Sequence, residues 1–192
     1  MAKTESSFKN MVLTLLSISL IASLSLGGVY NLTKEPIAIA QKQKKENAIK
    51  QVVPAFDRLE QVSVSPADGG DPVILNKVIK GDSLVGYAVE TYTDKGFGGR
   101  IELMVGFAPD GTIINTAVLK HTETPGLGDK MDAAKSGFPL QFMDKNPQKF
   151  KLSVKKDGGE VDAITAATIS SRAFCDAVAR GYEAVTREGD AK

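Results

Sequence analysis

"RIELMVGFAPDGTIINTAVLKHT", residues 100–122, predicts a β-hairpin. Two apolar runs rich in Val, Ile and Leu flank the short polar break "PDG". Asp110-Gly111 between such runs favours a tight turn, because glycine accepts the positive φ angle that these turns require. A parallel pair would instead need a crossover connection of roughly a dozen residues or more. We therefore expect the two runs to pair antiparallel.

The segments on either side of this hairpin extend the predicted sheet. On its N-terminal side, residues 72–79 and 83–93 are rich in β-branched and aromatic residues and are separated by "KGD". Residues 57–72, which contain "SPADGGDP", are expected to form a loop. On the C-terminal side we expect a partly helical segment at residues 131–142 and a second hairpin at residues 149–164.

The chain from Thr165 to Arg187 has helical periodicity and predicts the last helix. Its apolar stripe, which can bury against the sheet, consists of Ala166, Ile169, Ala173, Ala177, Val178, Gly181 and Val185. The predicted fold class is therefore α+β. We expect one domain, residues 57–192, in which an antiparallel sheet packs against helices that include the C-terminal helix.

The N-terminal region predicts a membrane anchor. "MVLTLLSISLIASLSLGGVY", residues 11–30, carries no charge, and about 20 such residues span the roughly 30 Å hydrocarbon core of a bilayer. We assign residues 11–31 to a transmembrane helix and residues 32–56 to a polar stalk helix with Pro36 in its first turn. Lys42, Lys44 and Lys45 are expected to form a solvated face of that stalk.

The lysines before the anchor predict its orientation. Lys3 and Lys9 place residues 1–10 in the cytoplasm by the positive-inside rule. The main domain would then lie on the extracytoplasmic, periplasmic side of the cytoplasmic membrane. Small residues near Ser25 and Gly27 leave a cleavable signal peptide as the alternative.

Composition excludes several classes of function. The 24 Lys and Arg nearly balance the 23 Asp and Glu, so the net charge of +1 gives no basis for nucleic-acid binding. The chain has one cysteine, Cys175, and one histidine, His121, which excludes an intrachain disulfide and a metal site that needs two imidazoles. We expect Cys175 to be buried and His121 to form a structural hydrogen bond. The sequence predicts no metal ligand and no catalytic residue.

"DAITAATISS", residues 162–171, places several hydroxyl side chains before the last helix. One interpretation is capping, in which Asp162 or Thr165 accepts hydrogen bonds from the first backbone amides. The other starts from the free N–H groups and partial positive charge of a helix N-terminus, which bind phosphate. A hydroxyl held there, such as that of Thr168, could become esterified by attacking a pyrophosphate. Because Asp162 is the only base nearby in sequence, a separate transferase would be required.

"HTETPGLGD", residues 121–129, predicts a second recognition element. Pro125-Gly126 is typical of a type II turn. Leu127 between Gly126 and Gly128 is an apolar residue in an otherwise polar loop. Such a loop could bring backbone amides and one apolar side chain against a flat ring, with polar contacts from Glu123 and Thr124. "GFGG", residues 96–99, is interpreted as a turn, because no strand-to-helix transition surrounds it.

Together these motifs resemble a known family. "DAITAAT" matches the flavinylation pattern D-x-x-S/T-G/A-A-T, "HTETPGLGD" matches an E-T-P-G-L-G loop, and "GFGGRIELMVGF" is similar to a glycine-led strand. The family is the FMN-binding domain of the G subunit of Rnf electron transport complexes and of the C subunit of sodium-pumping NADH:quinone reductases. Ala166 stands where that family usually has glycine, and we expect alanine to be tolerated there as part of the helical region.

The resemblance implies a covalent cofactor. FMN would be joined through its phosphate to the hydroxyl of Thr168 by a Mg-dependent flavin transferase, which takes FMN from FAD and releases AMP. The amides of Ile169, Ser170 and Ser171 would meet the phosphate. Other cofactor-binding residues would come from the two motifs, namely Asp162, Thr165, Ala167, Glu123, Thr124, Gly126, Leu127 and Gly128.

The implied function is electron transfer within a membrane complex. The chain would be a single-pass G subunit of the Rnf complex, a carrier that is not catalytic alone. It would relay electrons between reduced ferredoxin and NAD, with other membrane subunits as partners. The quinone-reductase C subunit is the nearest alternative. An alternative of another class is a membrane-anchored periplasmic binding or scaffold domain without flavin, in which Thr168 only caps the helix.

Overall fold

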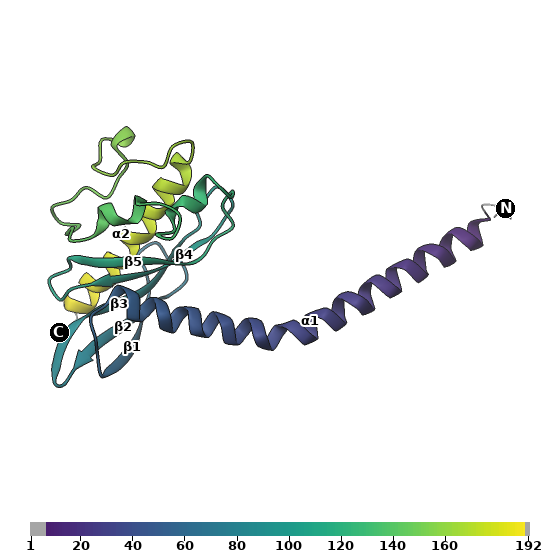
Figure 1. Cartoon of the computed structure of the whole chain (residues 1–192), viewed down its shortest axis with the longest axis horizontal. Helices are drawn as coiled ribbons and strands as arrows, with labels where there is room; N and C mark the ends of the chain where they lie inside the picture. The colour runs from purple at the N-terminus through teal and green to yellow at the C-terminus, as the bar shows by residue number, and fades with distance from the viewer. Residues whose placement is uncertain (1–6, 191–192) are drawn as a thin grey trace. The chain divides into compact units, whose positions relative to one another are not determined.

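The computed structural model describes residues 7–190 (Figure 1). These residues form two long helices, five strands and three short 3₁₀ helices, which are joined by loops and turns. In chain order they are α1 (Phe8–Val52), β1 (Arg58–Val64), β2 (Val73–Lys80), β3 (Ser83–Thr93), β4 (Ile101–Phe107), β5 (Ile113–Lys120), η1 (Gly128–Met131), η2 (Phe138–Phe142), η3 (Lys155–Asp157) and α2 (Thr168–Asp190). The chain forms two compact units, Met1–Gln43 and Lys44–Lys192. The second unit is called the C-terminal domain below.

The first unit is helical from Phe8 onward. Within residues 7–190, α1 is the one helix long and apolar enough to cross a membrane. Two of its serines are compatible with hydrocarbon because their hydroxyls donate to carbonyls one turn back: Ser17 Oγ donates to Leu13 O at 2.8 Å, and Ser23 Oγ donates to Ser19 O at 2.7 Å. Lys3, on which the predicted orientation partly rests, lies outside the described residues.

The residues assigned to the anchor and the stalk belong to one helix, and the expected place of Pro36 in a first turn is wrong. Helix α1 is continuous from Phe8 to Val52, and Pro36 lies inside it rather than in a first turn. Proline in a helix interior removes one backbone hydrogen bond, and the flanking turns still continue the helix. Lys42, Lys44 and Lys45 are exposed, as expected. Two of them also have partners, since Lys44 Nζ donates to Leu119 O and Lys45 forms an ion pair with Glu90.

The C-terminal domain contains a five-stranded antiparallel meander in the order β1-β2-β3-β4-β5. The predicted hairpin at residues 100–122 is confirmed by the pairing of β4 with β5. At its turn, Gly111 has φ +82° and donates to Ala108 O at 2.9 Å. The Asp110 carboxylate accepts from the backbone N–H of Thr112 at 2.9 Å and from its hydroxyl, which lowers the pKa of Asp110.

The expectation of a loop throughout residues 57–72 is wrong. Residues Arg58–Val64 form β1, an edge strand that pairs with β2. Most of its side chains are exposed, so neither face has the apolar alternation by which a half-buried strand is recognised. Backbone hydrogen bonds to β2, rather than side-chain burial, define this strand.

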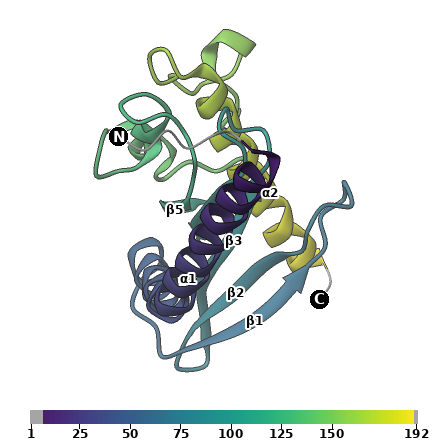
Figure 2. The same ribbon diagram turned by 90° about the vertical axis from the view of Figure 1, so that its right-hand side faces the viewer.

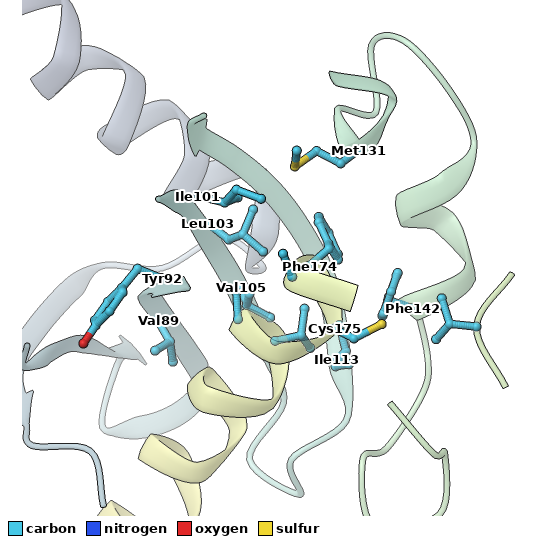
Figure 3. Packing of buried hydrophobic residues seen from close by; sticks show 14 of the residues in the cluster. Val89, Tyr92, Ile101, Leu103, Val105, Ile113, Met131, Phe142, Phe174 and Cys175 are labelled. Atoms are coloured by element: carbon cyan, nitrogen blue, oxygen red, sulfur yellow. The ribbon is translucent and has the colours of Figure 1, made fainter. Parts of the chain in front are cut away.

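Two apolar layers cover opposite faces of the sheet. Helix α2 runs along one face (Figures 1 and 2), where Phe174 and Cys175 lie among Leu103, Val105 and Ile113 (Figure 3). The prediction that Cys175 is buried is confirmed, and burial raises the pKa of its thiol to about 12.

The last turns of α1 cover the other face. Val52 packs there with Ala88 and Met104 in a second, smaller apolar cluster. Gly106 of β4 permits this approach, because a Cβ at that position would lie 1.8 Å from the carbonyl oxygen of Val52. The sheet therefore lies between the end of α1 and α2, so both faces are buried near β3 and β4.

The segment between β5 and α2 is irregular. The partly helical expectation for residues 131–142 is met by η2 at Phe138–Phe142. The hairpin expected at residues 149–164 is wrong, since only an isolated parallel bridge joins Val154 to Val161. Tight glycine turns between them replace strand pairing: Gly158 has φ +74°, and a Cβ on Gly159 would lie 2.0 Å from Ser153 O.

Candidate functional site

One cavity brings together segments that are far apart in sequence. It has a volume of about 330 Å³ and opens at the N-terminus of α2. Its walls come from the "GFGG" turn, the "ETPGLG" loop and the start of α2. The lining residues are Phe97, Glu123, Thr124, Leu127, Gly128, Ala166, Ala167, Thr168, Ile169 and Ser170.

The first turn of α2 has free backbone donors. The helix begins at Thr168 rather than at the expected Thr165, and Ser171 N–H is the first that donates to an upstream carbonyl, Ala167 O at 3.0 Å. The N–H groups of Thr168, Ile169 and Ser170 therefore have no intrahelical acceptor. Within residues 7–190, no side chain caps them.

The capping interpretation of "DAITAATISS" is therefore wrong for Asp162 and Thr165. The methyl group of Ala167, which precedes the helix, cannot accept a hydrogen bond. The expectation that the Ser171 amide is available is also wrong, because that amide is already bonded within the helix. The Ser171 hydroxyl instead hydrogen-bonds to the turn before the helix: it accepts from Ile164 N–H at 2.9 Å and donates to Ala167 O at 3.0 Å.

Ala166 sets the direction in which the chain enters α2. Its φ is +62°, in the left-handed region that alanine seldom adopts. The expectation that Ala166 belongs to the helical region is wrong. Glycine adopts a positive φ without a steric penalty. This explains why glycine is usual at this position in the family that the motifs resemble.

Glu123 connects all three segments of the cavity wall. Its side chain is buried, with 5% of the residue's surface exposed. One carboxylate oxygen accepts from Gly98 N–H at 2.8 Å in the "GFGG" turn, and the other accepts from the Ser170 hydroxyl on α2. The backbone N–H of Glu123 donates to His121 Nδ1 at 3.1 Å, the structural hydrogen bond expected for this histidine.

The "ETPGLG" loop forms the predicted type II turn. Gly126 has φ +78°, and Leu127 N–H donates to Thr124 O at 3.2 Å. Gly126 is exposed and is not among the cavity-lining residues, whereas Thr124, Leu127 and Gly128 are. Gly128 permits a close packing, because a Cβ there would lie 2.5 Å from the Ser170 hydroxyl oxygen.

Asp129 anchors the loop from its C-terminal end. Its buried carboxylate forms an ion pair with Lys135 at 2.7 Å. That hydrogen bond, helped by the backbone of Gly126, lowers the pKa of Asp129. A charged carboxylate at this position therefore stabilises the turn that presents Leu127.

Asp162 and Thr165 lie apart from the cavity. They line a separate open hollow of about 410 Å³ together with Lys130, Ser136 and Gln141. The Asp162 carboxylate is paired with Lys155 at 2.8 Å. The Gln141 side-chain amide holds the backbone of Asp162 by accepting from its N–H at 2.8 Å and donating to its carbonyl at 3.1 Å. The residues of "DAITAAT" therefore line two separate hollows: Asp162 and Thr165 line the open one, and Thr168 lines the cavity.

Phe97 is a cavity residue that the sequence interpretation missed. In the described part of the C-terminal domain, the large apolar side chains left exposed are Leu59, Phe97, Leu127, Leu140 and Ile169. Three of these five, Phe97 (69% exposed), Leu127 (40%) and Ile169 (47%), line this one cavity. Ile169 was expected in the buried stripe of α2. A grouping of exposed apolar side chains around a hollow is typical of a binding site.

Comparisons with known proteins agree with the motifs. The model of the FMN-binding domain family matches residues 96–183, from the first glycine of "GFGG" into α2. The G subunit of the ion-translocating oxidoreductase complex of Methanosarcina acetivorans is 35% identical over 182 residues, 93% of this chain and 94% of that relative. The corresponding G subunit of Pasteurella multocida is 36% identical, over 84% of this chain and 85% of its own. The chain therefore belongs to the family of G subunits of ion-translocating oxidoreductase complexes.

Proposed function

We propose that this chain is the FMN-carrying, electron-transferring G subunit of a membrane-bound Rnf complex, with FMN esterified through its phosphate to the Thr168 hydroxyl. One observation carries the proposal: Thr168 and the "ETPGLG" loop, 40 or so residues apart in sequence, line the same cavity. The match to the FMN-binding domain family supports FMN as the cofactor. The complex would pass electrons between reduced ferredoxin and NAD and couple their transfer to ion movement.

The cavity suits FMN in size and in the chemistry of its walls. A volume of about 330 Å³ is at the lower end of the roughly 300–1,000 Å³ of small-molecule sites. The free N–H groups of Thr168, Ile169 and Ser170 and the positive end of the α2 dipole favour a phosphate at the helix start. Leu127 and Ile169 provide apolar surface for a flat ring, and Thr124 provides a polar contact.

When bound, the flavin supplies the redox chemistry, and the chain's residues position it and exclude water from it. A phosphoester keeps one negative charge on the phosphate, which matches the free amides at the helix start. A covalent attachment also prevents loss of the cofactor from a domain that we place on the extracytoplasmic side of the membrane. Helix α1 would anchor the chain beside the other membrane subunits of the complex.

Within residues 7–190, neither carboxylate near Thr168 in the motifs is free to act as a base. The Glu123 carboxylate already accepts two hydrogen bonds, and the Asp162 carboxylate is paired with Lys155 outside the cavity. We propose that a flavin transferase with bound Mg²⁺ provides the base. The Thr168 oxygen would form a bond to the FMN phosphorus of FAD, the pyrophosphate bond would break, and AMP would leave while the transferase accepts the hydroxyl proton.

Co-expression with a flavin transferase tests this function. Wild-type protein should show flavin fluorescence on a denaturing gel and a mass increase equal to FMN minus water. Thr168→Ala should show neither. Thr186→Ala is a matched control, because its hydroxyl lies on the same helix and bonds only to carbonyls of its own turn. Wild-type protein that never acquires flavin would support the scaffold alternative.

A further inference from the structure

We propose that Phe97 is a wall of the flavin ring site, an aromatic side chain held against the cofactor by the "GFGG" turn. This inference rests on the proposed function, since it takes FMN at Thr168 as the occupant of the cavity. Phe97 is 69% exposed, the largest exposed fraction among the large apolar side chains around the cavity. Within residues 7–190 no other aromatic ring and no cation contacts it, and FMN would cover it.

The position of Phe97 is fixed by its neighbours in the turn. Gly98 N–H donates to the Glu123 carboxylate at 2.8 Å, and the Thr122 hydroxyl donates to Gly98 O at 2.5 Å. A Cβ on Gly96 would lie 2.2 Å from Gly99 O, and one on Gly98 would lie 2.1 Å from Thr122 O. Glycine is therefore required on both sides of Phe97, and two hydrogen bonds hold the backbone at Gly98.

The same contacts fix Phe97 relative to the attachment point. Glu123 binds Gly98 with one carboxylate oxygen and the Ser170 hydroxyl with the other. Ser170 is two residues after Thr168 in the first turn of α2. One buried carboxylate therefore joins the turn that presents Phe97 to the helix that would carry the flavin phosphate.

The chemistry of the three exposed side chains fits a flat, largely apolar ring. Phe97, Leu127 and Ile169 come from three different segments and have no polar atoms in their side chains. An aromatic face adds offset or edge contact with a second ring system, which an aliphatic side chain does not provide. A phenylalanine also shields a flavin from water without introducing a phenol or indole that quenches its emission.

Fluorescence of the flavin-loaded full chain tests the proposal. Phe97→Trp should lower the flavin emission yield at least about twofold, because an indole in contact with the ring quenches it by electron transfer. Phe97→Ala should raise the iodide quenching constant at least about twofold, because one wall of the site is removed. The matched controls are Leu140→Trp and Leu140→Ala, since Leu140 is 58% exposed and is not a cavity residue.

The outcomes separate this inference from the function on which it rests. Quenching changes confined to the Phe97 variants support it. Covalent flavin on every variant, with Phe97 and Leu140 variants giving equal emission and iodide quenching, overturns the inference and leaves the proposed function intact. Absence of covalent flavin from the wild-type chain overturns the proposed function, and the inference with it.

Discussion

Replacing Ala166 with glycine should stabilise the C-terminal domain. At φ +62°, Ala166 is in the left-handed region, which costs an L-residue with a Cβ roughly 1–2 kcal/mol. Glycine removes that penalty, but it also lowers the free energy of unfolding by roughly 0.4–1 kcal/mol, because it gives the unfolded chain more conformational freedom. Ala166 is exposed, so little packing is lost with its methyl group. We expect a net gain of about 0.5–1 kcal/mol in the free energy of unfolding.

Chemical unfolding in detergent measures this gain. Near-ultraviolet circular dichroism would follow Tyr87 and Tyr92, which are buried in the main apolar cluster. In thermal unfolding the same gain corresponds to a rise of about 1–4 °C in Tm for a domain of this size. The matched control is Ala179→Gly, at an exposed position in the interior of α2, where glycine should instead cost about 1 kcal/mol.

The two substitutions therefore have opposite expected signs. If Ala166→Gly destabilised the domain as much as Ala179→Gly does, residue 166 would not have a left-handed backbone. The account of how the chain turns into α2 would then be refuted.

Three further perturbations test other parts of the structure. Gly106→Ala should destabilise the domain by roughly 1–3 kcal/mol or more in chemical unfolding, because the new Cβ would meet the Val52 carbonyl at 1.8 Å. With a thiol pKa of about 12, Cys175 should react with a thiol reagent at pH 8 roughly 10³-fold more slowly than in the unfolded chain. Arg180 lowers the pKa of Asp68 to about 2 from the ordinary 3.8, so the folded state binds fewer protons and the free energy of unfolding should fall as pH falls from about 4 to about 2.

Each of these has an outcome that would contradict it. Gly137→Ala is the control for Gly106, since its added Cβ would make only an ordinary contact at 3.8 Å; equal effects would exclude the steric explanation. Native Cys175 labelling as fast as that of the unfolded chain would show that the thiol is accessible. Asp68→Asn should make the acid dependence shallower, and an unchanged slope would remove Asp68 as a contributor.

Strands with a buried face could be predicted from the sequence, and the edge strand could not. The hairpin of β4 and β5 follows from two apolar runs around Asp110-Gly111, which is a local signal. Strand β1 has mostly exposed side chains, so only its partner β2 defines it. The segment at residues 149–164 combines β-like composition with close glycine turns, and those turns prevent the expected hairpin.

Some residues of the candidate site could likewise be predicted from the sequence, and others could not. Thr168, Thr124 and Leu127 were predicted from motifs, and the structure places them on one cavity. Phe97 was missed because its relation to Thr168 depends on the buried contacts of Glu123, which join segments distant in sequence. The separation of Asp162 from the cavity depends on the backbone angles near Ala166, which spacing alone does not reveal.

Mapping the flavin-bearing peptide of the matured chain tests the central claim most directly. Proteolysis and tandem mass spectrometry of protein co-expressed with the transferase should place one FMN phosphate on Thr168 at the first residue of α2. A flavin on Thr165, which faces the other hollow, would contradict the account. So would an unmodified Thr168 in protein whose yellow colour is removed by denaturant.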